Sequence, residues 1–306
     1  MNKLIDKYLH HEWYFGTSSW KYPGWKGLIY HTKYSTEKSF QDTCLKEYSS
    51  HYSCVGVDHT YYNWPSAKGF LKYAEQTPAN FRFVLKATDK VTILKYPKLP
   101  RYGKEAGLIN PSFLDPNLFH DKFLSPLYPI KERIGPIMFE FSQFHRDSFS
   151  RGSEFVERLD QFLEKVSRTN DFKFAVEIRN ANWLQPAYFE CLARHRVGHV
   201  FNSWSRMPLL QEQFEKASSY LLPFIVIRLL LNPGTLYQQA VDSYSPYDKL
   251  HIEHLGIRNT VAQLILHARK LKVPAYTLVN NRFEGCAPKT LEGIFSIIES
   301  KDRSEA

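Results

Sequence analysis

Residues 172–183 combine a strand pattern with charged side chains near one end. They read Phe-Lys-Phe-Ala-Val-Glu-Ile-Arg-Asn-Ala-Asn-Trp. Side chains alternate between the two faces of a strand, so Glu177 and Arg179 are expected to share a face with the small Ala175, opposite Phe174. A carboxylate and a guanidinium side by side form an ion pair, and they also provide a base and an anion clamp.

Other strand patterns in the chain also end in polar side chains. These ends carry Asp58, Lys86, Glu140, Asn202, Arg228, and Asn280 with Asn281. If the strands are parallel neighbours, their carboxyl ends meet, and the cations converge with the carboxylates. One interpretation is a self-neutralising structural network in a core of low dielectric constant. The other is a site in which cations hold an anion while a carboxylate acts as base or nucleophile.

Large aromatic side chains follow the same strand ends. Five of the six tryptophans do so, and Tyr62 lies in an aromatic loop after Asp58: the five are Trp20, Trp25, Trp64, Trp183 and Trp204. Rings around a polar opening suit stacking against nucleobases or sugars, at about 1–3 kcal/mol for each stacked base. The same pattern is expected if the rings only close the top of the fold.

Strand and helix patterns alternate along the chain. The strand patterns lie at residues 14–19, 54–58, 81–88, 137–141, 172–179, 199–203, 224–228 and 275–280. Helical stripes separate them, the clearest at residues 153–166 with Ser153 as its expected N-cap. Eight such units predict an α/β fold, a single TIM-like (β/α)8 barrel. An open doubly wound sheet is the alternative, disfavoured by the count and by the lack of a Gly-x-Gly-x-x-Gly turn after the first strand.

The predicted barrel accounts for the whole chain as one domain, residues 1–306, with a core at about 14–300. The Pro-rich stretch 90–116 interrupts the rhythm after the third strand, and both of its flanks continue the rhythm. We interpret it as an inserted loop over one face of the barrel, because compact domains rarely carry so long a connection without a function.

The net charge and the composition indicate which classes of ligand and which cellular location to expect. The net charge of +9 favours anionic small molecules or nucleic acid. No targeting or membrane segment stands out, and the four cysteines lack Cys-x-x-Cys spacing, so a cytoplasmic location is expected. Only His59 directly follows a strand pattern, so no metal site is predicted, and neither a cofactor nor an obligate protein partner is indicated.

Five ordered motifs resemble the YecE-like family, also called domain of unknown function 72. They are Gly16-Thr-Ser-Ser-Trp-Lys-Tyr-Pro-Gly-Trp-Lys-Gly, Val57-Asp-His-Thr-Tyr-Tyr, Phe81-Arg-Phe-Val-Leu-Lys-Ala, Val176-Glu-Ile-Arg-Asn with Trp183, and Asn280-Asn-Arg-Phe-Glu-Gly-Cys-Ala-Pro. The resemblance implies a cytoplasmic, bacterial or archaeal TIM-barrel-like protein of unsettled activity, similar in shape to phosphate-processing barrels of the endonuclease IV type. By position it implies a shared polar set: Asp58, Lys86, Glu177, Arg179, Trp183, Arg228 and Asn280.

The chain departs from the family pattern at three places. Asp58 stands where the family usually has Glu, and Phe139-Glu-Phe-Ser-Gln-Phe replaces a Gln-Leu-Pro-Pro type of turn. After Arg228, Leu229-Leu-Leu-Asn-Pro-Gly replaces a His-Gly pair. The missing His argues against metal chemistry of the endonuclease IV type.

Three functions are compatible with these residues. The first is binding, with hydrolysis, of a phosphorylated or nucleic-acid ligand at the barrel mouth. Its catalytic residues would be Glu177, Asp58 and Lys86, and its ligand-binding residues Arg179, Arg228, Asn280, Asn281, Trp20, Trp25, Tyr62, Trp183 and Trp204. The second is a carbohydrate hydrolase with paired carboxylates, which the surrounding arginines disfavour because they would lower the pKa of a general acid. The third is a non-catalytic ligand-binding protein.

Overall fold

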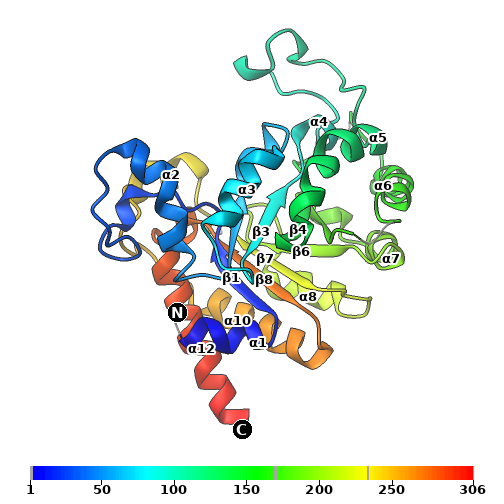
Figure 1. Cartoon of the computed structure of the whole chain (residues 1–306). Coiled ribbons are helices and arrows are strands. Elements are labelled where there is room, and N and C mark those ends of the chain that lie inside the picture. The colour runs from blue at the N-terminus through cyan, green and yellow to red at the C-terminus, as the bar shows by residue number, and fades with distance from the viewer. Residues whose placement is uncertain (1–2, 146, 169–170, 233, 306) are drawn as a thin grey trace.

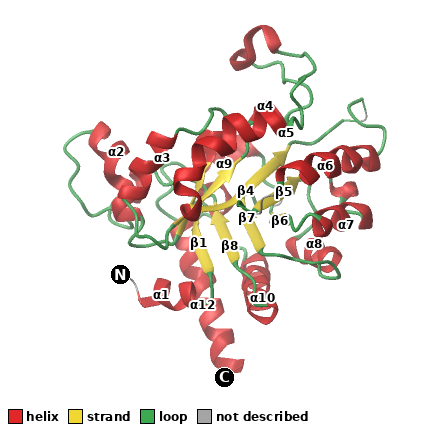
Figure 2. Ribbon diagram, turned by 45° about the vertical axis from the view of Figure 1, so that its right-hand side comes forward, coloured by secondary structure: helices red, strands yellow, loops and turns green. Residues whose placement is uncertain are grey.

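Eight parallel strands close into a barrel in the order of the chain, β1 to β8. This is a computed structural model, which describes residues 3–145, 147–168, 171–232 and 234–305. Figures 1 and 2 show the strands in the centre with helices around them. The predicted (β/α)8 barrel is therefore confirmed, and the open sheet is excluded. No helix in the described part of the chain is long and apolar enough to cross a membrane.

The strands are short and lie close to the predicted positions. They are β1 Trp13–Thr17, β2 Cys54–Val57, β3 Arg82–Lys86, β4 Ile134–Phe141, β5 Phe174–Ile178, β6 Gly198–Asn202, β7 Ile225–Leu229 and β8 Ala275–Val279. The helices are α1 Lys3–His10, α2 Glu37–Tyr48, α3 Ala67–Glu75, α4 Asp89–Thr92, α5 Pro116–Phe119, α6 Gly152–Val166, α7 Pro186–Arg194, α8 Leu210–Ala217, α9 Tyr237–Tyr244, α10 Leu255–Leu271, α11 Asn281–Glu284 and α12 Ala287–Glu305.

Helical turns at the carboxyl ends of strands carry several predicted residues. A 3-10 turn at Asp58–Tyr61 follows β2, and another at Ala181–Trp183 follows β5. The stretch after β3 contains α4, a 3-10 turn at Pro100–Glu105 and an antiparallel bridge between Lys95 and Ile109. Figure 1 shows part of this stretch projecting from the barrel as an arm.

The start of α6 differs from the prediction. The helix begins at Gly152, one residue before the expected cap Ser153, and its N-cap is Arg151. Arg151 makes no capping hydrogen bond with its side chain. The first amide groups of α6 therefore lack the side-chain acceptor that a Ser or Asp at the cap would supply.

Apolar side chains of the strands sort into two layers. One cluster contains Tyr14, Val84, Ala175 and Leu278 and fills the barrel, while Phe174, Val176 and Ile178 belong to the larger cluster between barrel and helices. This confirms the predicted alternation in β5, because Ala175 packs inside the barrel and its two neighbours pack outside.

Two tyrosines from the helices support the shortest strand pairings. β1 pairs with β2 through Gly16 with Cys54 and Thr17 with Val55, and there the hydroxyl of Tyr48 accepts from Thr17 N at 2.9 Å and donates to Cys54 O at 3.1 Å. β5 pairs with β6 through Ala175 with Gly198 and Val176 with His199. Here the hydroxyl of Tyr188 lies 3.0 Å from His199 Nδ1 and 3.4 Å from Val176 O.

A side chain at Gly16 would collide with this β1–β2 junction. A Cβ atom there would lie 1.9 Å from Cys54 O, whereas a Cβ on Gly256, in the first turn of α10, meets nothing within 4 Å. We expect Gly16→Ala to destabilise the protein by about 1–3 kcal/mol, as overpacking of a core does. Gly256→Ala, the control, should stabilise by about 0.5–1 kcal/mol. Urea unfolding of both variants measures the difference, and equal midpoints would contradict it.

Candidate functional site

Polar side chains form a layer at the carboxyl-terminal end of the barrel, two residues beyond an apolar interior layer. The rule of alternation places them on the inner face. Val84, Met138, Ala175, Val200 and Val226 fill the interior, and the residues two positions later are Lys86, Glu140, Glu177, Asn202 and Arg228. On β1 and β2 the equivalent positions are Gly16 and Gly56. Those two strands thus contribute no side chain at this level.

Glu140 is the centre of the network. Its Oε2 atom lies 2.9 Å from Lys86 Nζ, 3.0 Å from Arg179 Nη2 and 2.9 Å from Arg228 Nη1. Glu177 Oε1 accepts from Arg179 Nε at 3.1 Å and Nη2 at 3.0 Å, and Glu177 Oε2 accepts from Arg228 Nη1. The structure therefore brings together the three predicted cations and two of the three predicted carboxylates.

Burial and the neighbouring charges have opposite effects on the pKa values of the groups in this network. Burial alone would raise the pKa of Glu140, but Arg179, Lys86 and Arg228 outweigh it and hold that pKa well below the usual range. Burial also disfavours the charged form of Arg228, yet Glu177, Glu140 and Asp58 raise the pKa of this guanidinium. Both groups are ionised at neutral pH.

The rim of the network is open at Asp58. Its Oδ1 atom lies 3.9 Å from Arg228 Nη2, and 40% of the Asp58 side chain is exposed. Glu177 is fully buried. Without Asp58, three cations surround two carboxylates and leave one positive charge unbalanced. Asp58 balances it from a position that solvent reaches.

Two aromatic rings cover cations of the network. Lys86 Nζ lies 4.5 Å from the centre of the Tyr61 ring, and the Arg179 guanidinium lies 4.1 Å from the Trp204 ring. Cation–π contacts of this kind stabilise desolvated cations. Trp204, one of the predicted binding residues, thus lies against the network, and Tyr61 joins it although the prediction selected its neighbour Tyr62.

The other predicted aromatic residues occupy different surroundings. Trp25 is fully buried against Tyr22 and Tyr30, and Trp20 packs edge-on against Tyr73. Tyr62 is exposed beside Arg101. These positions show rings that serve packing or the surface, and ligand binding by them stays a prediction.

The two asparagines after β8 make local hydrogen bonds. The side chain of Asn280 accepts from Arg282 N at 3.0 Å and caps α11. Asn281 Oδ1 accepts from Ala287 N at 2.8 Å, while its buried Nδ2 has no hydrogen-bond partner among the described residues. Both side chains shape the turn between β8 and α12, and their predicted contact with a ligand is not tested by this geometry.

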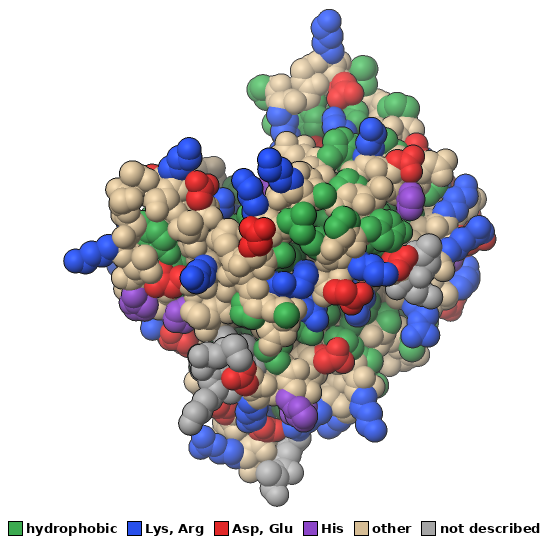
Figure 3. All heavy atoms as spheres, viewed as in Figure 1, with side chains coloured by type: hydrophobic (Ala, Val, Ile, Leu, Met, Phe, Trp, Pro, Cys, Tyr) green, Lys and Arg blue, Asp and Glu red, His purple; other side chains and the backbone are tan. Residues whose placement is uncertain are grey.

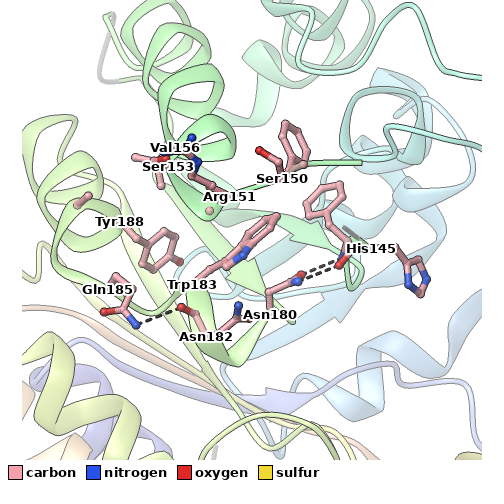
Figure 4. Close-up of a pocket in the computed structure, with 14 residues that line it drawn as sticks. His145, Ser150, Arg151, Ser153, Val156, Asn180, Asn182, Trp183, Gln185 and Tyr188 are labelled. Carbon is pink, nitrogen blue, oxygen red and sulfur yellow. Dashed lines mark hydrogen bonds between the residues drawn. The ribbon is translucent and has the colours of Figure 1, made fainter. Parts of the chain in front are cut away.

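Two pockets flank the loop that follows β4. One, of about 710 Å³, lies between residues 92–107 on one side and residues 142–145 with Ser148 on the other. The other, of about 510 Å³, lies between the starts of α6 and α7. They share Phe144 and His145 as a wall, and Figure 4 shows the second. The sequence analysis did not select Lys95, Lys98 or Arg101, which line the first pocket. The unusual length of the stretch 90–116 was the only feature of the sequence that pointed to these three residues.

One group of side chains outside the mouth has ligand types suited to a metal ion. Asp160, Cys191 and His195 place one ligand atom each within 4.8 Å of one another, on α6, α7 and the residue following α7. Asp160 Oδ1 is already bound by Arg194 Nη1 at 2.7 Å and by His195 Nε2 at 2.8 Å. The carboxylate is thus committed to an ion pair.

The network predicts a defined response to acid. We expect Glu140→Gln to destabilise the protein by about 3–5 kcal/mol at pH 7, because it leaves buried cations without their shared partner. Since the folded-state pKa of Glu140 is depressed, its contribution is complete above about pH 4.5, the ordinary value. Below that pH the deficit of the variant should shrink by about 1.4 kcal/mol for each pH unit until the folded-state pKa is passed.

Urea unfolding at several pH values, with the exposed Glu157→Gln as control, measures this deficit. A deficit that stayed constant between pH 7 and pH 3.5 would contradict the ion-pair network.

Comparisons with known proteins agree with the fold. The family model described as "Protein of unknown function DUF72" matches residues 14–304. The UPF0759 protein YunF of Bacillus subtilis is 26% identical over 179 residues, which cover 58% of this chain and 54% of that relative. The match thus spans about half the length of the relative.

Two solved structures of DUF72 family proteins share the architecture. One from Enterococcus faecalis superposes with a TM-score of 0.64 at 17% identity, covering 94% of this chain and 95% of that one. One from Thermotoga maritima gives a TM-score of 0.58 at 19% identity, covering 95% and 100%. Because the family model matches nearly the whole chain, the protein belongs to the DUF72 family.

Proposed function

We propose that the protein binds a phosphorylated ligand of the nucleotide or nucleic-acid type at the carboxyl-terminal mouth of its barrel. The observation that carries the proposal is the 710 Å³ pocket beside the network. Lys95, Lys98 and Arg101 line it, and no Asp or Glu occurs among its described lining residues. We call it the basic groove.

Aromatic rings in the basic groove match the bases of such a ligand. Tyr61, Tyr96 and Phe144 line it together with the cations. Single-stranded nucleic acids bind where a positive groove follows the backbone and rings stack on bases. Figure 3 shows hydrophobic side chains gathered below the projecting arm, with Lys and Arg side chains around them.

Tyr61 joins the basic groove to the network. Its ring lines the groove and covers Lys86 at 4.5 Å. Burial is the main cause that raises the pKa of the Tyr61 hydroxyl, followed by the charge of Glu140, so the hydroxyl stays protonated and can donate to a phosphate. A ligand in the groove therefore lies next to the buried cations.

The geometry supports binding more directly than catalysis. Arg179, Lys86 and Arg228 hold the pKa of Glu140 well below the usual range, so Glu140 cannot act as the protonated acid that a glycoside hydrolase needs. Glu177 is fully buried and is bound by Arg179 and Arg228. Asp58 alone among the three carboxylates is substantially exposed. It is the group from which hydrolysis of a bound phosphate ester would obtain a base.

The proposal keeps the cytoplasmic location. All four cysteines are buried and none forms a disulfide, as expected in a reducing compartment.

Neutralising the basic groove should weaken binding and its salt dependence. We expect the triple variant Lys95→Gln, Lys98→Gln, Arg101→Gln to bind a labelled ten-nucleotide single-stranded RNA or DNA at least about tenfold more weakly. The slope of log affinity against log salt should fall by about 2, because each contact with a single strand contributes about 0.7. Fluorescence anisotropy between 50 and 200 mM salt measures both quantities.

A second triple variant serves as control. It removes the same charge from exposed helix positions away from the groove, Lys38, Lys46 and Lys216, each changed to Gln. If this variant loses as much affinity as the groove variant, the binding is a diffuse effect of net charge and the proposal is wrong.

Substitution of Asp58 distinguishes ligand binding from ligand hydrolysis. Asp58→Asn removes a negative charge 3.9 Å from Arg228, so we expect a phosphorylated ligand to bind about fivefold more tightly. Any phosphate-ester hydrolysis by the wild type should disappear in the same variant. Binding that weakened in Asp58→Asn would contradict the placement of the ligand beside Arg228.

A further inference from the structure

The pocket of about 510 Å³ lies where two helices begin. Gly152 and Ser153 of α6 line it, as do Gln185, the N-cap of α7, and Ala187 of its first turn. Neither helix has a side-chain capping hydrogen bond. The first amides of α6 therefore remain available as donors. In the first turn of α7 only Ala187 N remains, because Pro186 has no N–H and Tyr188 N donates to Gln185 O at 3.0 Å. Both helix dipoles direct positive potential toward the pocket.

The charge of the pocket agrees with this potential. Arg151 lines it, and the described lining contains no Asp or Glu, although the charge of Arg151 also acts on Glu154. Glu154 lies in the first turn of α6, but its carboxylate is bound by the backbone and hydroxyl of Ser150. A cation faces the pocket and no carboxylate is among its lining residues.

An unpartnered indole provides a second, independent sign of a ligand. Trp183 is only 8% exposed, and its Nε1 atom donates no hydrogen bond to any residue in the described ranges. The edge of the ring that carries Nε1 faces Gly152, where a Cβ would lie 2.8 Å from Cδ1 and 3.2 Å from Nε1. Figure 4 shows Trp183 in the middle of the pocket residues, with Arg151 and Ser153 on one side and Asn182 and Gln185 on the other.

We propose that this pocket is a phosphate-binding subsite, formed by the start of α6, the indole N–H of Trp183 and the guanidinium of Arg151. Its ligand is the phosphate group of a small phosphorylated molecule. Amide, indole and guanidinium groups are all donors, and a phosphate offers several acceptor oxygens to them at once. The subsite deepens the proposed function and rests on it, because the pocket shares the Phe144–His145 wall with the basic groove.

The indole N–H itself reports on the subsite. In a 15N–1H spectrum the Trp183 side-chain signal is the one missing from Trp183→Phe. We expect inorganic phosphate, added at pH 7.5 up to 20 mM, to shift this signal in a saturable way. Arg151→Gln should weaken the apparent affinity about tenfold, whereas Arg168→Gln, which removes an exposed arginine beyond the other end of α6, should leave it unchanged.

Either of two results would overturn the subsite: a Trp183 signal that phosphate does not move, or equal affinities in Arg151→Gln and Arg168→Gln. Melting temperatures of the variants show that each is folded. Adenosine monophosphate and glucose 6-phosphate, used in place of phosphate, identify the source of the group, because the correct carrier should bind more tightly than phosphate alone.

The same samples distinguish failure of the subsite from failure of the proposed function. A phosphate shift that survives while the wild type fails to bind the oligonucleotide refutes the basic groove alone. Oligonucleotide binding without any phosphate shift refutes the subsite alone.

Discussion

One carboxylate oxygen, Oε2 of Glu140, holds the mouth of this barrel together. Three cations from three other strand ends lie within 3.0 Å of it. Buried ions are costly to desolvate, and each cation here is tolerated because the carboxylates compensate it. The positions of Lys86, Arg179 and Arg228 are thus set by their contacts with Glu140 and Glu177.

The mutual pairing of these buried charges also explains why structural and ligand-binding roles fall to different residues at the mouth. Charges that are fully engaged with one another give a rigid, water-poor floor, and they cannot move far toward a ligand. The charged groups that solvent reaches lie above the floor: Asp58 on the rim, Lys95, Lys98 and Arg101 in the basic groove, and Arg151 at the start of α6. Loops on a rigid scaffold commonly carry function in this way.

The barrel and its polar layer were predictable because both follow from alternation. Strands with an apolar inner face that end in a charge define the layer, and β5 showed the pattern most clearly. The importance of Glu140 relative to Glu177 was not predictable, because it depends on which oxygen lies between three cations. The tryptophans show the same limit: spacing placed Trp25 and Trp204 alike after strand ends, but only the packed structure separates a buried ring from one that covers Arg179.

The pockets escaped prediction for a different reason. Lys95, Lys98 and Arg101 lie in an irregular segment, where no periodicity connects a residue to a face. The N-cap of α6 lies two residues before the predicted one. Ser153 is a good capping residue by type, yet Arg151 is the cap and the helix begins at Gly152, whose missing side chain admits the Trp183 ring.

The two tyrosine-supported junctions divide the barrel into two half-barrels of four strands, β2 to β5 and β6 to β1. Lys86, Glu140, Glu177, Arg179 and Asp58 all belong to the first half, and Arg228 is the one member of the described network that comes from the second. Its guanidinium therefore acts as a clasp between the halves. Arg228 thus joins the two halves at the mouth, in addition to the strand pairings β1–β2 and β5–β6 and to the Trp204 ring that covers Arg179.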